Sequence, residues 1–393
     1  MADTVAQGHI FPDESQAITG VRSANLEWRG SHSVLWFREL DGGALDARLA
    51  DTYVLGSLLL WMTRGGSVHV HGAVSRTLLA NLDEWQAALH SLVSDQYSPV
   101  VITADEVVDA EPARSARAIA AFSGGLDSTT TAIRHARGLA GWRTEQLGAL
   151  LLVHGFDIGL DRAAEFDGAR GRALRAADVL GLEMRSVATN VRDLGQDWEL
   201  AHGLAIAATL QLYAPEFGVG LIASSAPYSR IHLLWGSNPA TDPLLSSGTM
   251  RICHDGAALT RTAKARVVAR EPELLGSLRV CWQGERLSRN CGRCEKCVRT
   301  YWALHIAGVR HPACFDEPFS VAPSQVRMPA VAMARWQEML RLADVEDDDE
   351  AARYIAAVLR YQRVRDALRR LGPLHAAAVR ARRRPGLARR LFT

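Results

Sequence analysis

The segment at residues 120–129, Ala-Ala-Phe-Ser-Gly-Gly-Leu-Asp-Ser-Thr, constrains the fold of this chain more than any other stretch. An apolar run ends at Phe122, two glycines follow, and the next residues have helical periodicity, which predicts a strand, a loop and a helix in succession. Glycine lets the backbone approach an anion closely, and the first turn of a helix offers N–H donors that have no partner inside the helix. The segment therefore predicts a loop that binds phosphate.

The residues of this loop suit different interactions with a phosphorylated ligand. Its serines can donate hydroxyl hydrogen bonds to phosphate, whereas an ionised Asp127 can only cap the helix or hold a metal ion that is bound to the phosphates. The loop of P-loop NTPases ends in Lys followed by Ser or Thr, and this segment contains no Lys. The alternative is an ordinary glycine turn before a helix. The expected cofactor-binding residues are Phe122, Ser123, Gly124, Gly125, Leu126, Asp127, Ser128 and Thr129.

Segments of strand and helix character alternate after residue 117. The expected strands span 119–122, 149–153, 184–189 and 218–224, and the expected helices between them span 129–139, 162–180 and 200–213. This alternation predicts an α/β fold, a parallel sheet with helices on both of its faces. Ligands of such folds bind at the carboxyl ends of the strands. His154 follows the second of these strands and is therefore added to the expected cofactor-binding residues.

Length and composition favour a globular protein of two or three domains, because the chain has 393 residues, of which 48% are hydrophobic and 22% charged. We expect an α+β accessory domain at residues 1–113, the α/β domain at 114–312 and a helical, Arg-rich extension at 313–393. The longest apolar stretch, at 53–62, is too short to span a bilayer, and the N-terminus lacks a signal-peptide pattern. We therefore expect a cytoplasmic protein with no membrane partner.

Four clustered cysteines form the second conspicuous motif. Their spacing is C-x9-C-x2-C-x2-C, and they are Cys281, Cys291, Cys294 and Cys297. Four thiolates at short spacing suit a tetrahedral Zn²⁺ ion, and a site filled by four cysteines has no open position for chemistry. We expect a structural zinc ion. An iron–sulfur cluster and a set of redox thiols are the alternatives.

The glycine loop and the cysteine cluster together resemble the PP-loop, or N-type, ATP pyrophosphatase superfamily, and within it the 7-cyano-7-deazaguanine synthases. The resemblance covers roughly residues 115–312. In that family a strand, a lysine-bearing helix start and the cysteine cluster follow in this order, and the segment 256–264 lies at the corresponding place. Lys264, which ends this segment, is one of only two lysines among 45 basic residues.

The resemblance implies the adenine nucleotide alpha hydrolase-like fold, ATP as a substrate, Mg²⁺ bridging its phosphates and a structural Zn²⁺ ion. It also implies catalytic roles for Asp127, Ser128 and Lys264. Lys264 would contact the phosphates of ATP or the departing pyrophosphate; the alternative is an exposed helix lysine. Two departures concern the acceptor substrate. The segment 154–159 differs from the Tyr-Gly-Gln type string of the family, and its Tyr-Pro-Asp-Cys string has only 240–243 as a counterpart.

The reaction that the resemblance implies has two steps. An oxygen of a carboxylate or carbonyl group on a small molecule attacks the α-phosphate of ATP, pyrophosphate leaves, and ammonia or another nitrogen nucleophile then displaces AMP to form an amide or a nitrile. Residues 1–113 contain no cysteine, so this part cannot be a cysteine-dependent glutaminase that supplies ammonia. A sulfurtransferase acting on tRNA or a small molecule is the first alternative, and a non-catalytic nucleotide-binding zinc scaffold is the second.

The C-terminal residues carry an unusual charge. Twelve arginines and a single acidic residue, Asp366, lie in residues 351–393. Such a segment either packs on an acidic surface or meets a polyanion, and the terminal arginines are candidates for a weak, salt-sensitive contact with RNA. The sequence leaves open whether the chain forms a homodimer.

Overall fold

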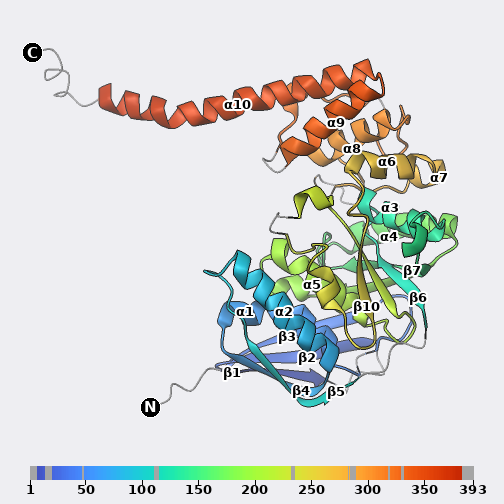
Figure 1. Ribbon diagram of the computed structural model, residues 1–393, viewed down its shortest axis with the longest axis vertical. Coiled ribbons are helices and arrows are strands. Elements are labelled where there is room, and N and C mark those ends of the chain that lie inside the picture. The colour runs from blue at the N-terminus through green and yellow to red at the C-terminus, as the bar shows by residue number, and fades with distance from the viewer. Residues whose placement is uncertain are drawn as a thin grey trace, which may run out of the picture. The chain divides into compact units, whose positions relative to one another are not determined.

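Figure 1 shows the computed structural model of the chain. It describes residues 7–13, 20–46, 48–109, 115–231, 235–281, 283, 289–316, 319–328 and 332–382, with side chains up to residue 368. The chain forms two compact units, Met1–Cys291 and Gly292–Thr393. None of the helices in these described ranges is long and apolar enough to cross a membrane.

The first unit is built on one ten-stranded sheet. Its strands are β1 (Gln7–Asp13), β2 (Val21–Trp28), β3 (Ser31–Glu39), β4 (Ser67–Ser75), β5 (Val101–Val108), β6 (Arg117–Ala121), β7 (Gln146–His154), β8 (Glu183–Thr189), β9 (Val219–Ala223) and β10 (Arg251–Asp255). Their spatial order is β10-β9-β6-β7-β8-β3-β2-β1-β4-β5. Neighbours are parallel except at β1–β2, β2–β3 and β3–β8. The predicted α/β class with a mostly parallel sheet is confirmed.

The five strands from β6 to β10 carry the doubly wound part of the sheet. All their pairings are parallel, in the spatial order β10-β9-β6-β7-β8. The chain thus runs outward from β6 to β8 on one side and continues with β9 and β10 on the other. The loops that follow β6 and β9 both leave the sheet at the carboxyl ends of these two strands, the place where ligands of doubly wound sheets bind.

Helices cover both faces of this part of the sheet. They are α3 (Leu126–Ala136), α4 (Ala163–Leu180) and α5 (Trp198–Gln211), with α6 (Arg261–Ala269) and the short α7 (Pro272–Leu275) after β10. Ile119, Leu151 and Val187 point into the core that contains α5, whereas α3 and α4 pack on the strands from outside that core. The apolar runs in β6, β7 and β9 follow from this double cover, since these strands are covered on both faces.

The strands β1 to β5 extend the same sheet. Residues 37–39 of β3 pair antiparallel with residues 187–189 of β8. Two helices, α1 (Asp51–Arg64) and α2 (Arg76–Leu92), pack on the strands β1–β5, and α1 also packs on α5 (Figure 1). The apolar stretch at 53–62 is therefore a core helix. The sequence instead suggested a separate domain ending at residue 113, because a pairing between segments this far apart leaves no local signal.

The second unit is helical. It contains α8 (Glu295–Ile306), α9 (Met333–Val345) and α10 (Asp349–Arg382). The indole Nε1 of the fully buried Trp336 donates a hydrogen bond of 2.8 Å to Oε1 of Glu295, which ties α9 to the start of α8. Because α8 packs on α9 and α10, it belongs to the second unit, and the boundary between the units follows Cys291. The sequence had predicted the end of the α/β domain at residue 312.

Candidate functional site

The glycine loop lies at the carboxyl end of β6, the strand that neighbours β9 in the sheet. Gly124 has a φ of +73°, a backbone conformation that residues other than glycine rarely adopt. Gly125 is the N-cap residue of α3, and no side chain caps this helix end. The N-cap residue therefore leaves this helix end without a side-chain acceptor of its own. Asp127 does not cap the helix, which was one of the two roles that its sequence position suggested.

The two serines of the loop hold its shape. The hydroxyl of Ser128 donates to the carbonyl oxygen of Gly125 at 3.2 Å, and its Oγ lies 3.4 Å from Oγ of Ser123. The N–H group of Gly125 donates to Oγ of Ser123 at 3.3 Å. A serine O–H can rotate toward an anion at little cost in free energy. Both serines can therefore donate hydrogen bonds to an anion that binds at the loop.

Asp127 contacts two cations that α6 carries. Its Oδ1 accepts a hydrogen bond of 2.8 Å from Nζ of Lys264, and its Oδ2 accepts one of 3.0 Å from Nη1 of Arg261. Lys264 is 2% exposed and also donates to the carbonyl oxygen of Ser224, the residue after β9. This lysine therefore links the loops at the carboxyl ends of β6 and β9. The alternative of an exposed helix lysine is excluded by its burial.

Arg279 brings a further buried charge to the loop. Its backbone N–H donates to the carbonyl oxygen of Gly124 at 2.8 Å, and its side chain is 4% exposed. Nη2 lies 3.7 Å from Oδ2 of Asp157, whereas Nε and Nη1 have no hydrogen-bond partner among the described residues. Burial lowers the pKa of Arg279, against the opposing charge of Asp157. Buried donors without acceptors are costly, so this guanidinium is suited to an anion that enters the site.

His154 contacts the loop and the helix that follow β7. Its Nε2 lies 2.9 Å from the carbonyl oxygen of Gly159, and its ring stacks on Phe166 with centroids 4.2 Å apart. These contacts hold the loop that carries Asp157 toward Arg279. His154 thus has a positioning role for that loop, and its contact with a cofactor stays a prediction.

Asp255, at the end of β10, holds α3 in place through hydrogen bonds with side chains of this helix. Its carboxylate accepts a hydrogen bond of 2.8 Å from Thr131 and a second one from Arg134. Burial by itself raises the pKa of Asp255, but His135, Arg134 and Thr131 outweigh this effect and hold the pKa well below its usual range. The carboxylate is therefore ionised at neutral pH and anchors the helix whose first turn forms the site.

A cavity of about 200 Å³ lies beside the edge strand β10. It contains no residue of the glycine loop; its lining consists of His135, Trp142, Arg143, Glu145, Leu221, Arg251, Cys253, His254 and Asp255. The glycine loop therefore offers its donors outside this cavity.

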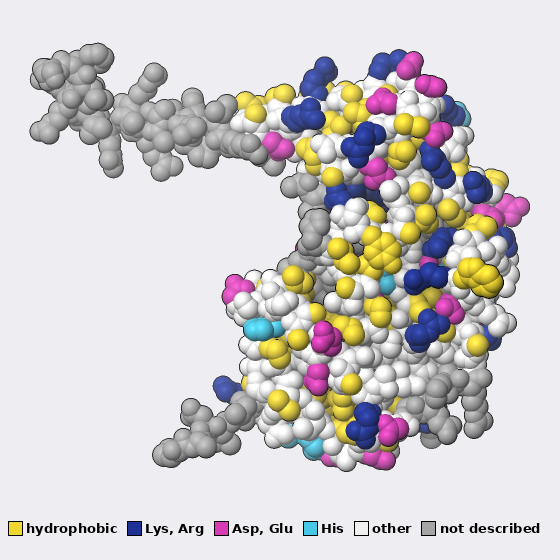
Figure 2. All heavy atoms as spheres, in the orientation of Figure 1, with side chains coloured by type: hydrophobic (Ala, Val, Ile, Leu, Met, Phe, Trp, Pro, Cys, Tyr) yellow, Lys and Arg dark blue, Asp and Glu magenta, His cyan; other side chains and the backbone are white. Residues whose placement is uncertain are grey.

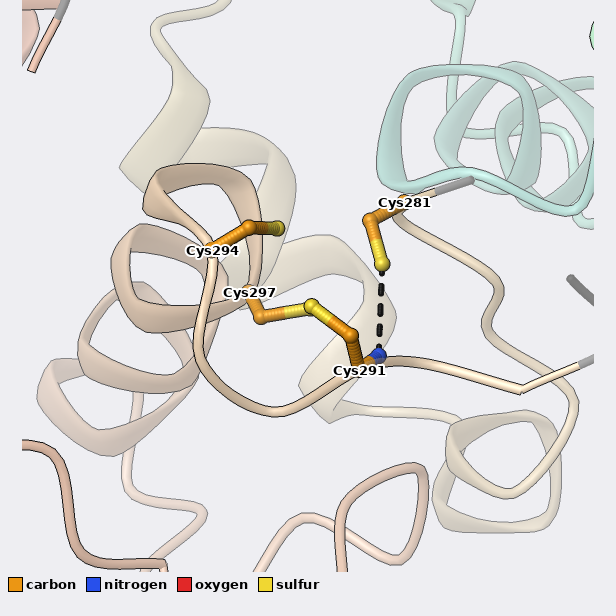
Figure 3. A group of neighbouring side chains, drawn as sticks. All are labelled: Cys281, Cys291, Cys294 and Cys297. Carbon is orange, nitrogen blue, oxygen red and sulfur yellow. Dashed lines mark hydrogen bonds between the residues drawn. The ribbon is translucent and has the colours of Figure 1, made fainter. Parts of the chain in front are cut away.

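The four clustered cysteines come together as predicted. Figure 3 shows their side chains turned toward one another, and their sulfur atoms all lie within 4.8 Å of each other. The N–H group of Cys291 donates to Sγ of Cys281 at 3.3 Å, and Cys294 is the N-cap residue of α8. Thiolate ligands at a helix start with backbone N–H···S contacts suit a closed Zn²⁺ site. This cluster can bind zinc.

Asn290 holds the loop that carries the cysteines. Its Oδ1 accepts a hydrogen bond of 2.8 Å from the N–H of Val280, and its Nδ2 donates to the carbonyl oxygen of Leu278 at 2.9 Å. The two bonds bring the segment before Cys281 beside the segment that begins with Cys291. The sequence did not single out this residue, since an asparagine before a cysteine carries no specific signal.

Comparisons of this chain with protein-family models, curated proteins and solved structures give no significant match.

The structure thus brings together Asp127, Ser128 and Lys264, three residues that the sequence predicted as catalytic. It adds two arginines that sequence reasoning did not assign to this site, Arg261 and Arg279. Neither has a local signal, because Arg replaces Lys almost throughout the chain. Figure 2 shows basic and acidic side chains lying among one another on the face in view. Of the terminal arginines proposed to contact RNA, Arg382 is the last residue of α10, and Arg383, Arg384, Arg389 and Arg390 lie outside the described residues.

Proposed function

We propose that this chain is an ATP-dependent ligase of the PP-loop type, with the adenine nucleotide alpha hydrolase-like fold. It transfers AMP to an oxygen of a small-molecule acceptor, releases pyrophosphate, and then joins a nitrogen nucleophile to the activated carbon. The observation that carries the proposal is the guanidinium of Arg279, which is 4% exposed and whose Nε and Nη1 have no partner among the described residues beside the glycine loop. A polyanion that lies on the loop satisfies these donors.

The charges around the loop support pyrophosphate as the group that is held. Lys264, Arg261 and Arg279 are cationic, and they face the carboxylates of Asp127 and Asp157. With a nucleotide bound so that its pyrophosphate rests on the loop, this excess of positive charge would stabilise the negative charge that develops as the bond between the α- and β-phosphates breaks. Fixed donors in a water-poor site stabilise such charge without reorganisation, which is a major source of catalysis.

The remaining parts of the proposal follow from the side chains that the site contains. Asp127 would hold Mg²⁺, which neutralises phosphate charge when bound, once an entering polyanion takes over Lys264 and Arg261, the cations that now pair with both oxygens of its carboxylate. The four-cysteine cluster would hold Zn²⁺ in a structural role. We assign no enzyme nucleophile, so the acceptor oxygen itself attacks the α-phosphorus, and the protein contributes positioning and charge.

Product analysis tests this function. The purified chain is incubated with ATP, Mg²⁺, ammonium and a series of carboxylates, starting with a 7-deazaguanine carboxylate, and the nucleotides are separated by ion-exchange chromatography. We expect AMP and pyrophosphate in equal amounts with one of the acceptors. Release of ADP and orthophosphate would overturn the proposal. Turnover that needs sulfide in place of ammonium would identify a sulfurtransferase, and ATP binding without turnover on any acceptor would identify a scaffold.

A further inference from the structure

A histidine-rich group lies on the sheet face opposite to α1 and α2. Along β1, β4 and β5 the residues alternate, and the apolar ones, such as Ile10 and Val70, are buried in the core. The alternate positions carry His9 on β1, His69 and His71 on β4, and Asp105 on β5. In this parallel pairing His9 lies directly opposite His69, and His69 opposite Thr103. Three neighbouring strands thus place imidazoles and a carboxylate on one patch.

Three of these residues converge on a point. His69, His71 and Asp105 each offer a ligand atom, and the three atoms all lie within 4.8 Å of one another. Nε2 of His69 lies 2.8 Å from Oδ1 of Asp105, and Nδ1 of His71 lies 3.9 Å from Oδ2 of the same carboxylate. A metal ion bound at about 2.0–2.2 Å from nitrogen and oxygen ligands needs separations of this order.

Both ring nitrogens of His69 have a partner. Nδ1 lies 2.9 Å from Oγ1 of Thr103, which also lies 3.4 Å from the carbonyl oxygen of Val68, and Nε2 lies 2.8 Å from Oδ1 of Asp105. In the metal-free protein a proton on Nε2 joins the imidazole to the carboxylate. A bound metal ion replaces this proton, and the oxygen of Thr103 then accepts from Nδ1–H while its hydroxyl donates to Val68.

His71 is held in a similar way. Its Nε2 lies 3.1 Å from Nδ1 of His9, and its ring stacks on Phe11 with centroids 4.0 Å apart and an interplanar angle of 6°. The contact with His9 engages one ring nitrogen and leaves Nδ1 facing Asp105. Metal-binding histidines commonly use their second nitrogen in this manner, which fixes the ring and raises its basicity as a ligand.

We propose that His69, His71 and Asp105 form a second metal site, which binds a divalent transition-metal ion of the zinc class through two imidazoles and one carboxylate. The site differs from the cysteine cluster in its ligands and in its access to solvent. The side chains of His69, His71 and Asp105 are 25%, 34% and 54% exposed. A fourth coordination position is therefore open to water or to an oxygen ligand, as in zinc sites that bind substrate. Thr103 and His9 are positioning residues. This proposal is independent of the ligase function.

Cobalt binding tests the site in the full chain, prepared without a polyhistidine tag and stripped of metal under reducing conditions. Co²⁺ is added stepwise, and the bound metal is measured after gel filtration together with the visible and near-ultraviolet spectrum. We expect two Co²⁺ ions per chain, one with the intense sulfur-to-metal charge-transfer bands of thiolate ligands and one without them. The His71→Gln and Asp105→Asn variants should each bind one Co²⁺ and keep the charge-transfer bands unchanged.

His32→Gln is the matched control, since His32 lies exposed on the same sheet and pairs with Glu27. It should bind two ions like the parent chain. Thr103→Val should still bind the second ion, but about 10- to 100-fold more weakly, because it loses only an orienting partner. A parent chain that binds Co²⁺ only at the thiolate site would overturn the proposal. Retention of both ions by His71→Gln and Asp105→Asn would overturn it equally.

Discussion

Nζ of Lys264 lies 2.8 Å from Oδ1 of Asp127, so an ion pair joins α6 to the first turn of α3 beside the glycine loop. The lysine side chain is 3% exposed and the aspartate side chain 24% exposed. Loss of the ion pair would therefore destabilise the charged lysine more than the charged aspartate, because water reaches the aspartate more easily. The two residues lie on helices that follow different strands, β6 and β10. Their contact therefore sets the spacing of the elements that surround the proposed pyrophosphate site.

Loss of Asp127 should abolish turnover and weaken the fold only in part. Asp127→Ala removes one partner of a buried ammonium, which costs about 3 kcal/mol, the low end for such pairs because the carboxylate is partly exposed. In the double variant with Lys264→Met we expect this stability to return, while pyrophosphate release stays lost. Urea unfolding and a pyrophosphate assay measure the two effects. A folded and fully active Asp127→Ala protein would remove Asp127 from the mechanism.

Arg279→Met should weaken the binding of pyrophosphate without lowering the stability of the ligand-free protein. The variant removes a buried guanidinium whose Nε and Nη1 have no partner in the described part of the chain, so the ligand-free protein should melt at the same temperature or higher. Pyrophosphate, which we expect to raise the melting temperature of the parent chain, should no longer do so. Arg137→Met is the control, since Arg137 is 37% exposed and pairs with Glu271 at 3.1 Å. Equal stabilisation of both variants by pyrophosphate would contradict the assignment.

The cysteine cluster should hold one zinc ion that stabilises the fold. We expect elemental analysis of the His71→Gln variant to find one equivalent of zinc, because that variant lacks the second site. Cys294→Ser should lower the melting temperature by several degrees, since metal binding and folding of this segment are coupled. Cys253→Ser, which changes a cysteine outside the cluster, should keep the zinc. Visible absorption from iron in the purified protein would indicate an iron–sulfur cluster instead.

Asp51 should make the fold less stable as the pH rises. Burial raises the pKa of Asp51 to about 7, although the N–H of Ser75 donates to its Oδ1 at 2.9 Å and opposes this shift. An unfolded aspartate titrates near 3.9, so the folded state holds an extra proton between about pH 4 and 7. Stability due to this group is therefore full below about pH 4, falls up to about pH 7 and stays low above it.

Asp51→Asn removes this dependence while it keeps the acceptor for Ser75. We expect the variant to be more stable than the parent chain at pH 8 by at least about 1 kcal/mol, and to differ little at pH 4.5, because a buried neutral amide costs less than a buried carboxylate. Urea unfolding at the two pH values measures the difference. An equal effect of the substitution at both pH values would show that Asp51 does not titrate in this range.

The Arg-rich C-terminus should be dispensable for chemistry on a small molecule. Removal of residues 380–393 should leave ATP turnover unchanged, and it should remove a weak RNA affinity that falls steeply with salt. Filter binding with a single-stranded RNA at low and moderate salt measures this affinity. If the shortened chain loses activity on a small acceptor at every salt concentration, the tail belongs to the fold or the site, and the RNA interpretation is wrong.

Sequence patterns predicted four of the five strands in the doubly wound part of the sheet and missed the edge strand β10. The expected strand at 184–189 is Glu183–Thr189, and the expected helix at 162–180 is Ala163–Leu180. Both are apolar where they pack, and their ends are marked by polar or glycine residues. β1 to β3 were not singled out, because several of their outward positions carry polar residues.

The candidate site was predictable where its residues are close in sequence. The glycine loop and the four cysteines are local motifs, and the structure places each set together. Arg261 and Arg279 reach the loop only through the packing of α6 and of the segment after α7. In a chain with 45 basic residues, of which two are Lys, an arginine that ends up buried has no distinctive neighbourhood in the sequence.

The pairing of β3 with β8 also bears on how the chain is made on the ribosome. Residues 37–39 must wait for residues 187–189 to be synthesised before the two can pair. Until then β3 is an open edge with unpaired N–H and C=O groups, which invites association with other chains. A fragment that ends near residue 113 would keep that edge permanently. Such a fragment should therefore aggregate when expressed alone and stay monomeric only when β8 is supplied.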